Sequence, residues 1–401
     1  MKILFICQYF YPEVFRGNDI AFHWAKKGHE IHVVCGIPNY PHGKFYDGYG
    51  LFKKRQEEVS GVRVTRLPIF PRGNGKIMLM LNYFSYLIAA WVYMLIHALS
   101  HKYDRVFVQQ LSPVMMSAPG VLYKRIRKVP LYTWVLDLWP ESLTAAGGIN
   151  NRYILSFFRH YVKSEYKHSD KILISSRSFE KSIAEYGDYS SKIVYYPQWA
   201  DGNDGVVKAP ENAPIIPDGF KLMFAGAVGE AHGFECTMQA ALLTKDHKDI
   251  RWVIVGDGRR LDWVKGFVKE HGLEETVFTL GRYPADTMPW FFKHADVMLV
   301  TLNDDPLFKL YAPAKISSYM AAAKPILAVL NGEGTEVIKA ADCGWSLPAG
   351  DAEGFAKLAI ELSKMDKAVL IEKGQNAAKY YDEHFVKEKC LAKLDELMGI
   401  C

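Results

Sequence analysis

The 401-residue chain has few cysteines and lacks the motifs of several large enzyme classes. Its six cysteines are scattered, without a C-x-x-C pair or a His-rich partner tract: Cys7, Cys35, Cys236, Cys343, Cys390 and Cys401. This pattern indicates neither a zinc site nor a disulfide framework and fits a reducing cytoplasm. No G-x-S-x-G, H-E-x-x-H or Walker A sequence occurs, which removes the hydrolase, metalloprotease and P-loop interpretations. No D-x-D occurs either, so we predict no metal site and no cofactor.

The composition is that of a soluble globular protein with a divided charge. Apolar residues make up 49% and charged residues 23%, and the length suffices for two domains. Residues 1–200 carry 26 Lys/Arg against 14 Asp/Glu, whereas residues 201–401 carry 23 against 30. The basic half should therefore meet anions or an anionic surface. The first apolar run ends at Cys7, too soon for a signal peptide.

Short apolar, β-rich segments alternate with helix-length segments through most of the chain. The first set is 2–7, 30–35, 63–69, 105–109, 131–136, 171–175 and 193–196; the second is 221–225, 251–255, 277–280, 296–300 and 325–329. This alternation predicts two doubly wound α/β domains. Pro and Gly are frequent at 197–219, so we place the boundary near residue 203. The expected domains are 1–203 and 204–380, with residues 381–401 as a helix able to cross back to the first.

Residues 77–99 have no formal charge and are long enough to span a bilayer. Basic residues surround the segment, including Lys53, Lys54, Arg72 and Lys76 before it and the run Lys124–Lys128 after it. A half-buried helix that docks on a membrane fits best. A plain core helix and a true span are the alternatives, and a span would separate the helix from the neighbouring strands.

Several loops that follow strands are suited to phosphate binding. The loop Phe15–Asn18 precedes a helix but lacks the full G-x-G-x-x-G pattern, which disfavours a nicotinamide or flavin enzyme. The loop Gly226–Gly233 and the turn Gly256–Gly258 also follow strands. Lys315 lies in the first turn of a predicted helix, where a cation is unfavourable unless an anion is held there. These features predict a phosphate-bearing ligand at the carboxyl ends of the second set of strands.

The residues resemble a known family, the retaining family 4 glycosyltransferases of GT-B architecture. The resemblance covers almost the whole chain and is greatest for the bacterial branch of N-acetyl-L-fucosaminyl and other amino-sugar transferases of O-antigen and capsule synthesis. The segments that carry it are Gln8–Glu13, Gly36–Lys44, Asp137–Ser142, Gly226–Gly233, Gly256–Gly258 and Pro313–Pro325. It implies two Rossmann-like domains facing a cleft, with a UDP-sugar on the second domain and the acceptor on the first.

The chain departs from the family pattern at several positions. Ala227 and His232 stand where the family has a diphosphate-binding Arg and Lys. Leu310 and Ser318 stand where it has two glutamates, and Leu136 replaces a histidine beside the sixth carbon of the donor sugar. The last loss fits a 6-deoxy amino-sugar donor.

The resemblance and the loop pattern together give a set of expected site residues. We expect Asp137, Glu141 and Lys315 to be catalytic, with either carboxylate orienting or deprotonating the acceptor hydroxyl. We expect a helix cap as the alternative role of Asp137. The expected donor-binding residues are Gly17, Asn18, Gly226, Gly229, Glu230, His232, Arg282, Tyr283, Lys315 and Ser318. The expected acceptor-binding residues are Asn39, Tyr40, Lys44 and Trp139, although packing is the commoner role for a tryptophan.

The sequence therefore predicts a cytoplasmic, peripheral-membrane, metal-independent retaining glycosyltransferase. It would move an N-acetylated, potentially 6-deoxy hexosamine from UDP to a polyprenyl-diphosphate-linked saccharide, at the anionic inner face of the bacterial membrane. A UDP-sugar 2-epimerase and a non-catalytic nucleotide-sugar-binding subunit are the alternatives. No nucleic-acid-binding module is indicated.

Overall fold

The computed structural model describes residues 1–73, 75–143, 151–200 and 207–400, which form two compact units. The first unit comprises Met1–Gln198 and Leu391–Cys401, and the second comprises Trp199–Cys390. The boundary expected at residue 203 lies outside the described residues. The second unit also continues beyond residue 380, because one uninterrupted helix, α13 (Lys367–His384), runs through that position.

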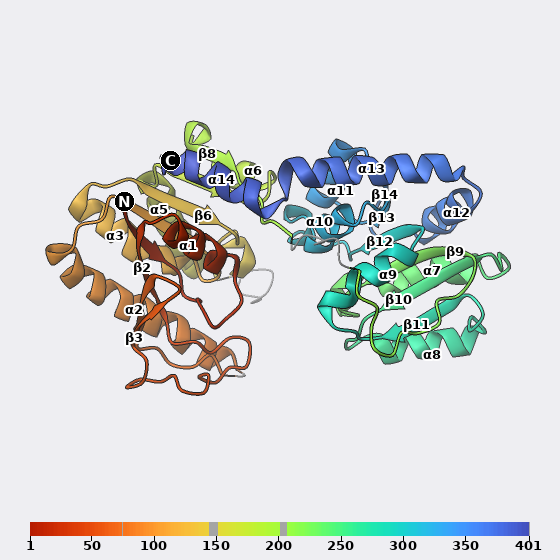
Figure 1. Cartoon of the computed structure of the whole chain (residues 1–401), viewed down its shortest axis with the longest axis horizontal. Coiled ribbons are helices and arrows are strands. Elements are labelled where there is room, and N and C mark those ends of the chain that lie inside the picture. Colours follow the sequence, from red (N-terminus) through yellow and green to blue (C-terminus); the bar gives the residue numbers. More distant parts are fainter. Residues whose placement is uncertain (74, 144–150, 201–206, 401) are drawn as a thin grey trace. The chain divides into compact units, whose positions relative to one another are not determined.

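The first unit is built on an eight-stranded sheet with the order β3-β4-β2-β1-β5-β6-β7-β8 (Figure 1). All pairs are parallel except β3 with β4. The strands are β1 (Lys2–Ile6), β2 (Glu30–Gly36), β3 (Gln56–Val59), β4 (Val62–Leu67), β5 (Arg105–Gln110), β6 (Leu131–Val135), β7 (Lys171–Ile174) and β8 (Ile193–Tyr195). The helices are α1 (Arg16–Lys26), α2 (Lys76–Ser100), α3 (Ala118–Arg127), α5 (Arg152–His168), α6 (Phe179–Ala184) and α14 (Lys387–Met398), with 3₁₀ turns η1 (Val114–Ser117) and η2 (Ser190–Lys192).

The second unit is built on a six-stranded, all-parallel sheet with the order β11-β10-β9-β12-β13-β14. The strands are β9 (Phe220–Ala225), β10 (Ile250–Val255), β11 (Val277–Gly281), β12 (Val297–Thr301), β13 (Ile326–Val329) and β14 (Gly344–Leu347). The helices are α7 (Phe234–Leu243), α8 (Leu261–His271), α9 (Met288–His294), α10 (Ala314–Ala321), α11 (Glu333–Ala341), α12 (Ala352–Ser363) and α13, with 3₁₀ turns η3 (Glu230–His232), η4 (Ala285–Thr287) and η5 (Phe308–Leu310).

Alternate residues of each central strand of the second unit enter two separate cores. On β9, Leu222 and Phe224 face one core, whereas Met223 and Ala225 face the other. Helices α7, α8 and α12 cover the first face, and α9, α10, α11 and α13 cover the second. Burial on both faces explains why these strands read as continuous apolar runs. The doubly wound arrangement leaves the carboxyl ends of the parallel strands as the place where loops can hold a ligand.

Helix α2 connects β4 to β5 and packs one face on the sheet of the first unit. Its buried residues Tyr86, Ala90, Met94 and Ala98 recur at helical spacing. The Tyr86 hydroxyl donates to the Cys7 carbonyl at 3.0 Å. Among the described residues it is the one helix long and apolar enough to cross a membrane, yet only 22% of its most apolar stretch is buried. The helix is therefore half-buried, with an apolar face left in contact with solvent.

Candidate functional site

A buried ammonium group lies at the carboxyl-terminal edge of the second sheet. Lys315 occupies the first turn of α10, which begins after Pro313 without a side-chain cap. Its Nζ is buried and has no hydrogen-bond partner within the described residues, and it lies 3.7 Å from the ring centroid of Phe224. Burial lowers the pKa of Lys315 to about 7. An unpaired buried cation is costly, so this position is built for an anion.

His232 lies beside Lys315 at the end of the loop that joins β9 to α7. Its Nδ1 is also buried without a partner among the described residues. Burial, together with a smaller effect of the charge of Lys315, lowers the pKa of His232 to about 4. The imidazole is therefore neutral at physiological pH, and it can offer a hydrogen bond without adding charge. The two side chains together point to an anion with oxygen acceptors.

The loop that carries His232 is fixed to the end of β12. Thr301 Oγ1 donates to the His232 carbonyl at 2.6 Å, and Asn303 Nδ2 donates to the Glu230 carbonyl at 2.6 Å. The Asn303 amide donates to the Ala231 carbonyl at 2.9 Å. The position of the loop is thus set by β12, the strand that pairs with β9 in the sheet.

Glycines allow neighbouring loops and the Lys315 side chain to lie close to the backbone at this edge. Gly226 has a φ of +140°, and a Cβ there would lie 3.3 Å from Lys315 Nζ. Gly256 has a φ of +150°, and a Cβ there would lie 1.8 Å from the Gly226 carbonyl oxygen. Any larger residue at 256 would push the two loops apart. Gly256 therefore serves the close approach of two loops, and the predicted approach of these glycines to a ligand stays a prediction.

The other predicted donor-site residues differ in their exposure and in the groups that they contact. Gly229 immediately precedes η3, and Glu230 is exposed. Ser318 Oγ contacts the Ala314 carbonyl of its own helix at 3.5 Å. Arg282 follows β11 and is exposed, and the Tyr283 ring packs on Phe291 with centroids 4.7 Å apart. Gly226, Gly229, His232 and Lys315 are brought together, whereas among the described residues no hydrogen bond, ion pair or ring contact joins Arg282 or Tyr283 to them.

Gly17 and Asn18 lie in the first unit and have local structural roles. A Cβ at Gly17 would lie 2.0 Å from Gln109 Oε1, so glycine is needed where α1 passes β5. Asn18 Nδ2 donates to the Glu13 carbonyl at 2.6 Å and closes the loop before α1. Its Oδ1 is buried and unpartnered among the described residues. Asn18 thus retains one acceptor that a ligand can use, and Gly17 lies close to the Gln109 side chain.

Glu13 organises the segment that contains Asn39 and Tyr40. Its Oε1 accepts from the Asn39 amide at 2.7 Å and from the Tyr40 amide at 2.6 Å. Burial raises the pKa of Glu13 to about 7, although these bonds act in the opposite direction. Asn39 is itself buried, and its Oδ1 accepts from the Arg72 amide at 2.9 Å. Asn39 therefore positions the loop, while Tyr40 and Lys44 are exposed.

Asp137 and Glu141 follow β6 and are both shielded from solvent. Asp137 Oδ2 accepts from the Ser112 amide at 2.8 Å, and burial raises the pKa of Asp137. Burial also raises the pKa of Glu141, whose Oε2 has no partner among the described residues. Raised carboxyl pKa values at a strand end are typical of acid–base sites.

Trp139 packs inside the first unit. It is 5% exposed, its Nε1 donates to Ser112 Oγ at 3.0 Å, and its ring lies 5.1 Å from that of Phe158. The expected acceptor-binding platform at Trp139 is therefore a packing element, because no open ring face is available to a sugar.

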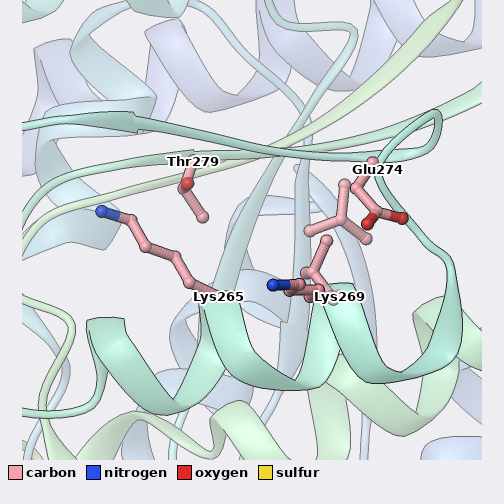
Figure 2. Close-up of a pocket in the computed structure, with 6 residues that line it drawn as sticks. Lys265, Lys269, Glu274 and Thr279 are labelled. Atoms are coloured by element: carbon pink, nitrogen blue, oxygen red, sulfur yellow. The ribbon is translucent and has the colours of Figure 1, made fainter.

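A shallow pocket elsewhere in the second unit does not coincide with the Lys315 centre. It is lined by Lys265, Val268, Lys269, Glu274, Val277 and Thr279. Figure 2 shows Lys265 and Lys269 projecting from α8 beside Thr279 and Glu274. Val277 is the first residue of β11, so the pocket reaches the amino-terminal end of that strand. In the part of the chain that the structure describes, no group of three or more His, Cys, Asp or Glu residues could hold a metal ion.

Comparison with known proteins agrees with a ligand site around Lys315 in the second unit. Residues 208–381 match the family model "Glycosyl transferases group 1", a stretch that includes the glycine loops and Lys315. "Probable glycosyltransferase WbjE" of Pseudomonas aeruginosa is 31% identical over 254 residues, which span 60% of this chain and 62% of that protein. "Putative colanic acid biosynthesis glycosyl transferase WcaI" of Escherichia coli K12 is 24% identical over 289 residues, 69% of each chain.

The solved structure of Anabaena Alr3699/HepE in complex with UDP has a TM-score of 0.68 and 15% identity over the whole of both chains. The two parallel-stranded α/β units, taken with this likeness, define a protein of the GT-B fold. Within it, residues 208–381 match the model of the glycosyl transferases group 1. The prediction of a GT-B fold is thus confirmed, the match agrees with the prediction of a glycosyltransferase, and the amino-sugar branch stays a prediction.

Proposed function

We propose that this protein is a retaining glycosyltransferase of bacterial surface-polysaccharide synthesis. It moves an N-acetylated hexosamine from UDP to a saccharide linked to polyprenyl diphosphate. The observation that carries the proposal is the buried, unpartnered ammonium of Lys315 at the strand ends of a glycosyltransferase group 1 domain. The HepE neighbour was solved with UDP, and the two curated relatives are named for glycosyl transfer.

Lys315 acts on the leaving group. When the bond between the anomeric carbon and the β-phosphate oxygen breaks, negative charge develops on UDP, and the ammonium neutralises it. A preorganised cation in a water-poor position is worth far more than the same cation in water. His232 contributes a neutral hydrogen bond in place of the family lysine, so the cation comes from α10 instead of from the loop after β9.

The acceptor hydroxyl forms the new glycosidic bond and loses its proton. Asp137 and Glu141 are the carboxylates that we assign to orienting this hydroxyl and receiving the proton. Burial raises the pKa of both groups, which makes them better bases than exposed carboxylates at neutral pH. Neither step requires a metal ion in this proposal.

The lipid-linked acceptor brings the enzyme to the inner face of the membrane. Large apolar residues are exposed along α2 from Ile77 to Leu99: Ile77, Met80, Leu81, Phe84, Ile88, Trp91, Val92, Ile96 and Leu99. Lys102, Arg125 and Lys128 are exposed in the same unit. An apolar stripe with basic residues nearby suits an interface of anionic lipids.

The test is the release of UDP from UDP-amino sugars in the presence of a prenyl-diphosphate-linked saccharide. The wild type should release UDP and form a longer saccharide. Lys315→Met should lower the rate by about 10²-fold, because one charge-stabilising group is lost. Lys357→Met is the matched control, since Lys357 is exposed on α12. Wild-type turnover by Lys315→Met would contradict the assignment, and conversion of the UDP-sugar without acceptor would instead identify an epimerase.

A further inference from the structure

Among the described residues, no carboxylate forms an ion pair with the Arg72 guanidinium. Arg72 follows β4, and its side chain is half-buried. Its Nη1 donates to the Tyr9 hydroxyl at 3.1 Å, and its guanidinium lies 5.3 Å from the ring centroid of Tyr40. Within the described residues, its Nε and Nη2 make no recorded hydrogen bond. The fork of donors that recognises phosphate oxygens is therefore largely unused.

The backbone around Arg72 is held firmly. The Arg72 amide donates to Asn39 Oδ1, and Glu13 in turn fixes Asn39 and Tyr40 through their amides. This chain of bonds joins three segments that are distant in sequence. Glu13 is thus a positioning residue for Arg72, and the guanidinium pays little conformational entropy when an anion binds.

Aromatic rings surround the guanidinium on the side of the neighbouring loops. The rings of Tyr9 and Phe15 are stacked 5.2 Å apart, and Tyr40 lies 5.6 Å from Tyr9 and 5.5 Å from Phe15. Phe15 and Tyr40 are partly exposed. Aromatic faces beside a cation suit a ligand that combines phosphate with sugar or hydrocarbon.

Tyr83 on α2 links Arg72 to Asp137. Burial raises the pKa of Tyr83, the positive charge of Arg72 lowers it, and the negative charge of Asp137 raises it. The phenol therefore lies within electrostatic range of both groups. Arg72 is thus in the neighbourhood of the carboxylate assigned to the acceptor hydroxyl.

The apolar face of α2 begins five residues after Arg72. Ile77 is 77% exposed, and Phe70, two residues before Arg72, is 53% exposed. Asn82 Nδ2 donates to the Phe70 carbonyl at 2.6 Å, and the Phe70 amide donates to Ser85 Oγ at 3.0 Å. The segment that carries Arg72 is thereby tied to the second and third turns of α2. Phosphate recognition and an apolar surface are contiguous here.

We propose that Arg72 binds the phosphate of a lipid-linked acceptor, with the prenyl chain running along the exposed apolar face of α2 and the saccharide directed toward Asp137. This inference rests on the proposed function and names the residue that reads the lipid phosphate of the acceptor. The occupant is an amphiphile, a phosphorylated isoprenoid, because only a ligand with both a phosphate and a hydrocarbon chain can contact the Arg72 guanidinium and the apolar face of α2 together.

The test is a binding titration of the full chain with farnesyl diphosphate, farnesol and inorganic diphosphate, with UDP saturating so that Lys315 is occupied. The wild type should bind farnesyl diphosphate at least tenfold more tightly than either of the other two compounds. Arg72→Gln should weaken farnesyl diphosphate at least tenfold and leave farnesol unchanged. Arg72→Lys should recover part of the affinity, because the charge returns without the planar fork.

Arg63→Gln is the matched control, because Arg63 is an exposed arginine on β4, the strand that precedes Arg72 in the chain. UDP affinity, measured separately for every variant, shows whether the fold and the second unit are intact. Unchanged farnesyl diphosphate affinity in Arg72→Gln, or no binding by the wild type, overturns the inference. Failure of the wild type to bind UDP is a different result and overturns the proposed function itself.

Discussion

Lys315 illustrates how a residue can be unfavourable for folding and useful for binding. Its ammonium is buried beside Phe224 without a hydrogen-bond partner among the described residues, at the amino terminus of a helix whose dipole repels it. The lack of a hydrogen-bond partner and the helix dipole both destabilise the charged ammonium in the unliganded protein, and the cation–π contact with Phe224 offsets only part of that cost. A bound diphosphate reverses both effects, because the anion pairs with the ammonium and also suits the helix terminus. The position therefore makes physical sense as a ligand site.

UDP binding should depend on pH through Lys315. The pKa of Lys315 is about 7 without ligand, and a bound diphosphate should return it toward its ordinary value of 10.5. Binding above pH 7 then takes up a proton, so affinity should fall about tenfold per pH unit between about pH 7.5 and about pH 9.5. Calorimetry in buffers of different ionisation enthalpy measures the proton uptake directly. Lys315→Met should lose this slope, and the same slope in the variant would assign it to another group.

Glu165 should make the stability of the first unit dependent on pH. It is 1% exposed, both carboxyl oxygens lack partners among the described residues, and burial raises its pKa from 4.5 to about 8. The nearby Ser117 hydroxyl donates to Val114 instead. Because the folded state holds the proton more tightly, stability is greatest below pH 4.5 and falls as the pH rises through 8. The loss is at most about 1.4 kcal/mol per pH unit.

Glu165→Gln tests this contribution, because the amide has nearly the same shape and does not titrate. Urea unfolding of both proteins at several pH values gives the difference in unfolding free energy. The wild type should lose stability relative to the variant as the pH rises through this range. A difference that stays constant with pH would show that Glu165 ionises as easily in the folded state as in the unfolded one.

Single residues were predictable from sequence only where their local setting was unusual. Lys315 could be found because a lysine in the first turn of a helix has no local explanation. Arg72 and Glu13 gave no such signal, since their roles arise from contacts among segments near residues 13, 39 and 72. The phosphate-binding role expected of Gly17 stays a prediction, and the structure places Gly17 against the Gln109 side chain.

At the scale of elements, α14 joins the end of the chain to the first unit. Asp395 on α14 accepts from His23 Nε2 and Trp24 Nε1 at 2.8 Å and from Lys27 Nζ at 2.7 Å. Lys393 Nζ donates to the Tyr195 carbonyl at 3.0 Å, which places α14 beside β8 (Figure 1). Burial raises the pKa of Asp395, but the hydrogen bonds from Lys27, His23 and Trp24 have the larger combined effect and lower the pKa below its ordinary value.

Asp395→Ala should lower the unfolding free energy of the first unit by about 3 kcal/mol at neutral pH, because three donors lose a shared buried acceptor. The stabilisation from a lowered carboxyl pKa is present above the unfolded value of 3.8 and disappears as the pH falls. The difference between wild type and variant should therefore shrink in acid. Denaturant unfolding followed by tryptophan fluorescence measures it, and an unchanged midpoint at neutral pH would show that α14 contributes little.

Helix α2 should bind anionic vesicles through its exposed apolar face. Replacing Ile88 and Ile96 with Glu puts charge where we expect lipid, and it should reduce co-sedimentation with anionic vesicles by about tenfold or more. Both side chains are well exposed, at 61% and 68%, so the fold should tolerate the change. Ile371→Glu is the control, because Ile371 is 60% exposed on α13 of the second unit. Undiminished sedimentation of the double variant would exclude α2 as the docking face.

The buried parallel strands were evident from sequence because both of their faces are apolar. Two strands at sheet edges escaped notice. β3 reads Gln-Glu-Glu-Val and pairs antiparallel with β4, and β14 contains only four partly buried residues. Neither has an apolar run, since an edge strand needs only partial burial and is held by pairing with its neighbour. The expectation that residues 77–99 form a half-buried helix depended on their composition. The buried positions at helical spacing show which face of the helix is covered.

For the whole molecule, two doubly wound units in one chain could be predicted because strands and helices alternate on both sides of a Pro- and Gly-rich stretch. The path of the last residues could not be settled in the same way. Whether α14 packs on the second unit or returns to the first depends on Asp395 meeting donors on α1, more than 360 positions earlier in the chain. Contacts of this separation leave no local pattern in a single sequence.

The distribution of charge along the chain agrees with the different roles that we propose for its two halves. The half of the chain that carries α2 and Arg72 has an excess of Lys and Arg, and the half that carries Lys315 has an excess of Asp and Glu. A basic surface favours approach to anionic lipid and to a phosphorylated acceptor. In the acidic half, the nucleotide would be recognised by one buried cation and by backbone groups.

The most direct test of the central claim is a thermal-shift panel with UDP, GDP, ADP and CMP, run with and without a chelator. A ligand that binds only the folded state raises the melting temperature by mass action. We predict a shift that is selective for UDP, that survives chelation and that is much smaller in Lys315→Met. No shift with any of the four nucleotides would contradict the account, because the buried ammonium would then have no nucleotide diphosphate to receive.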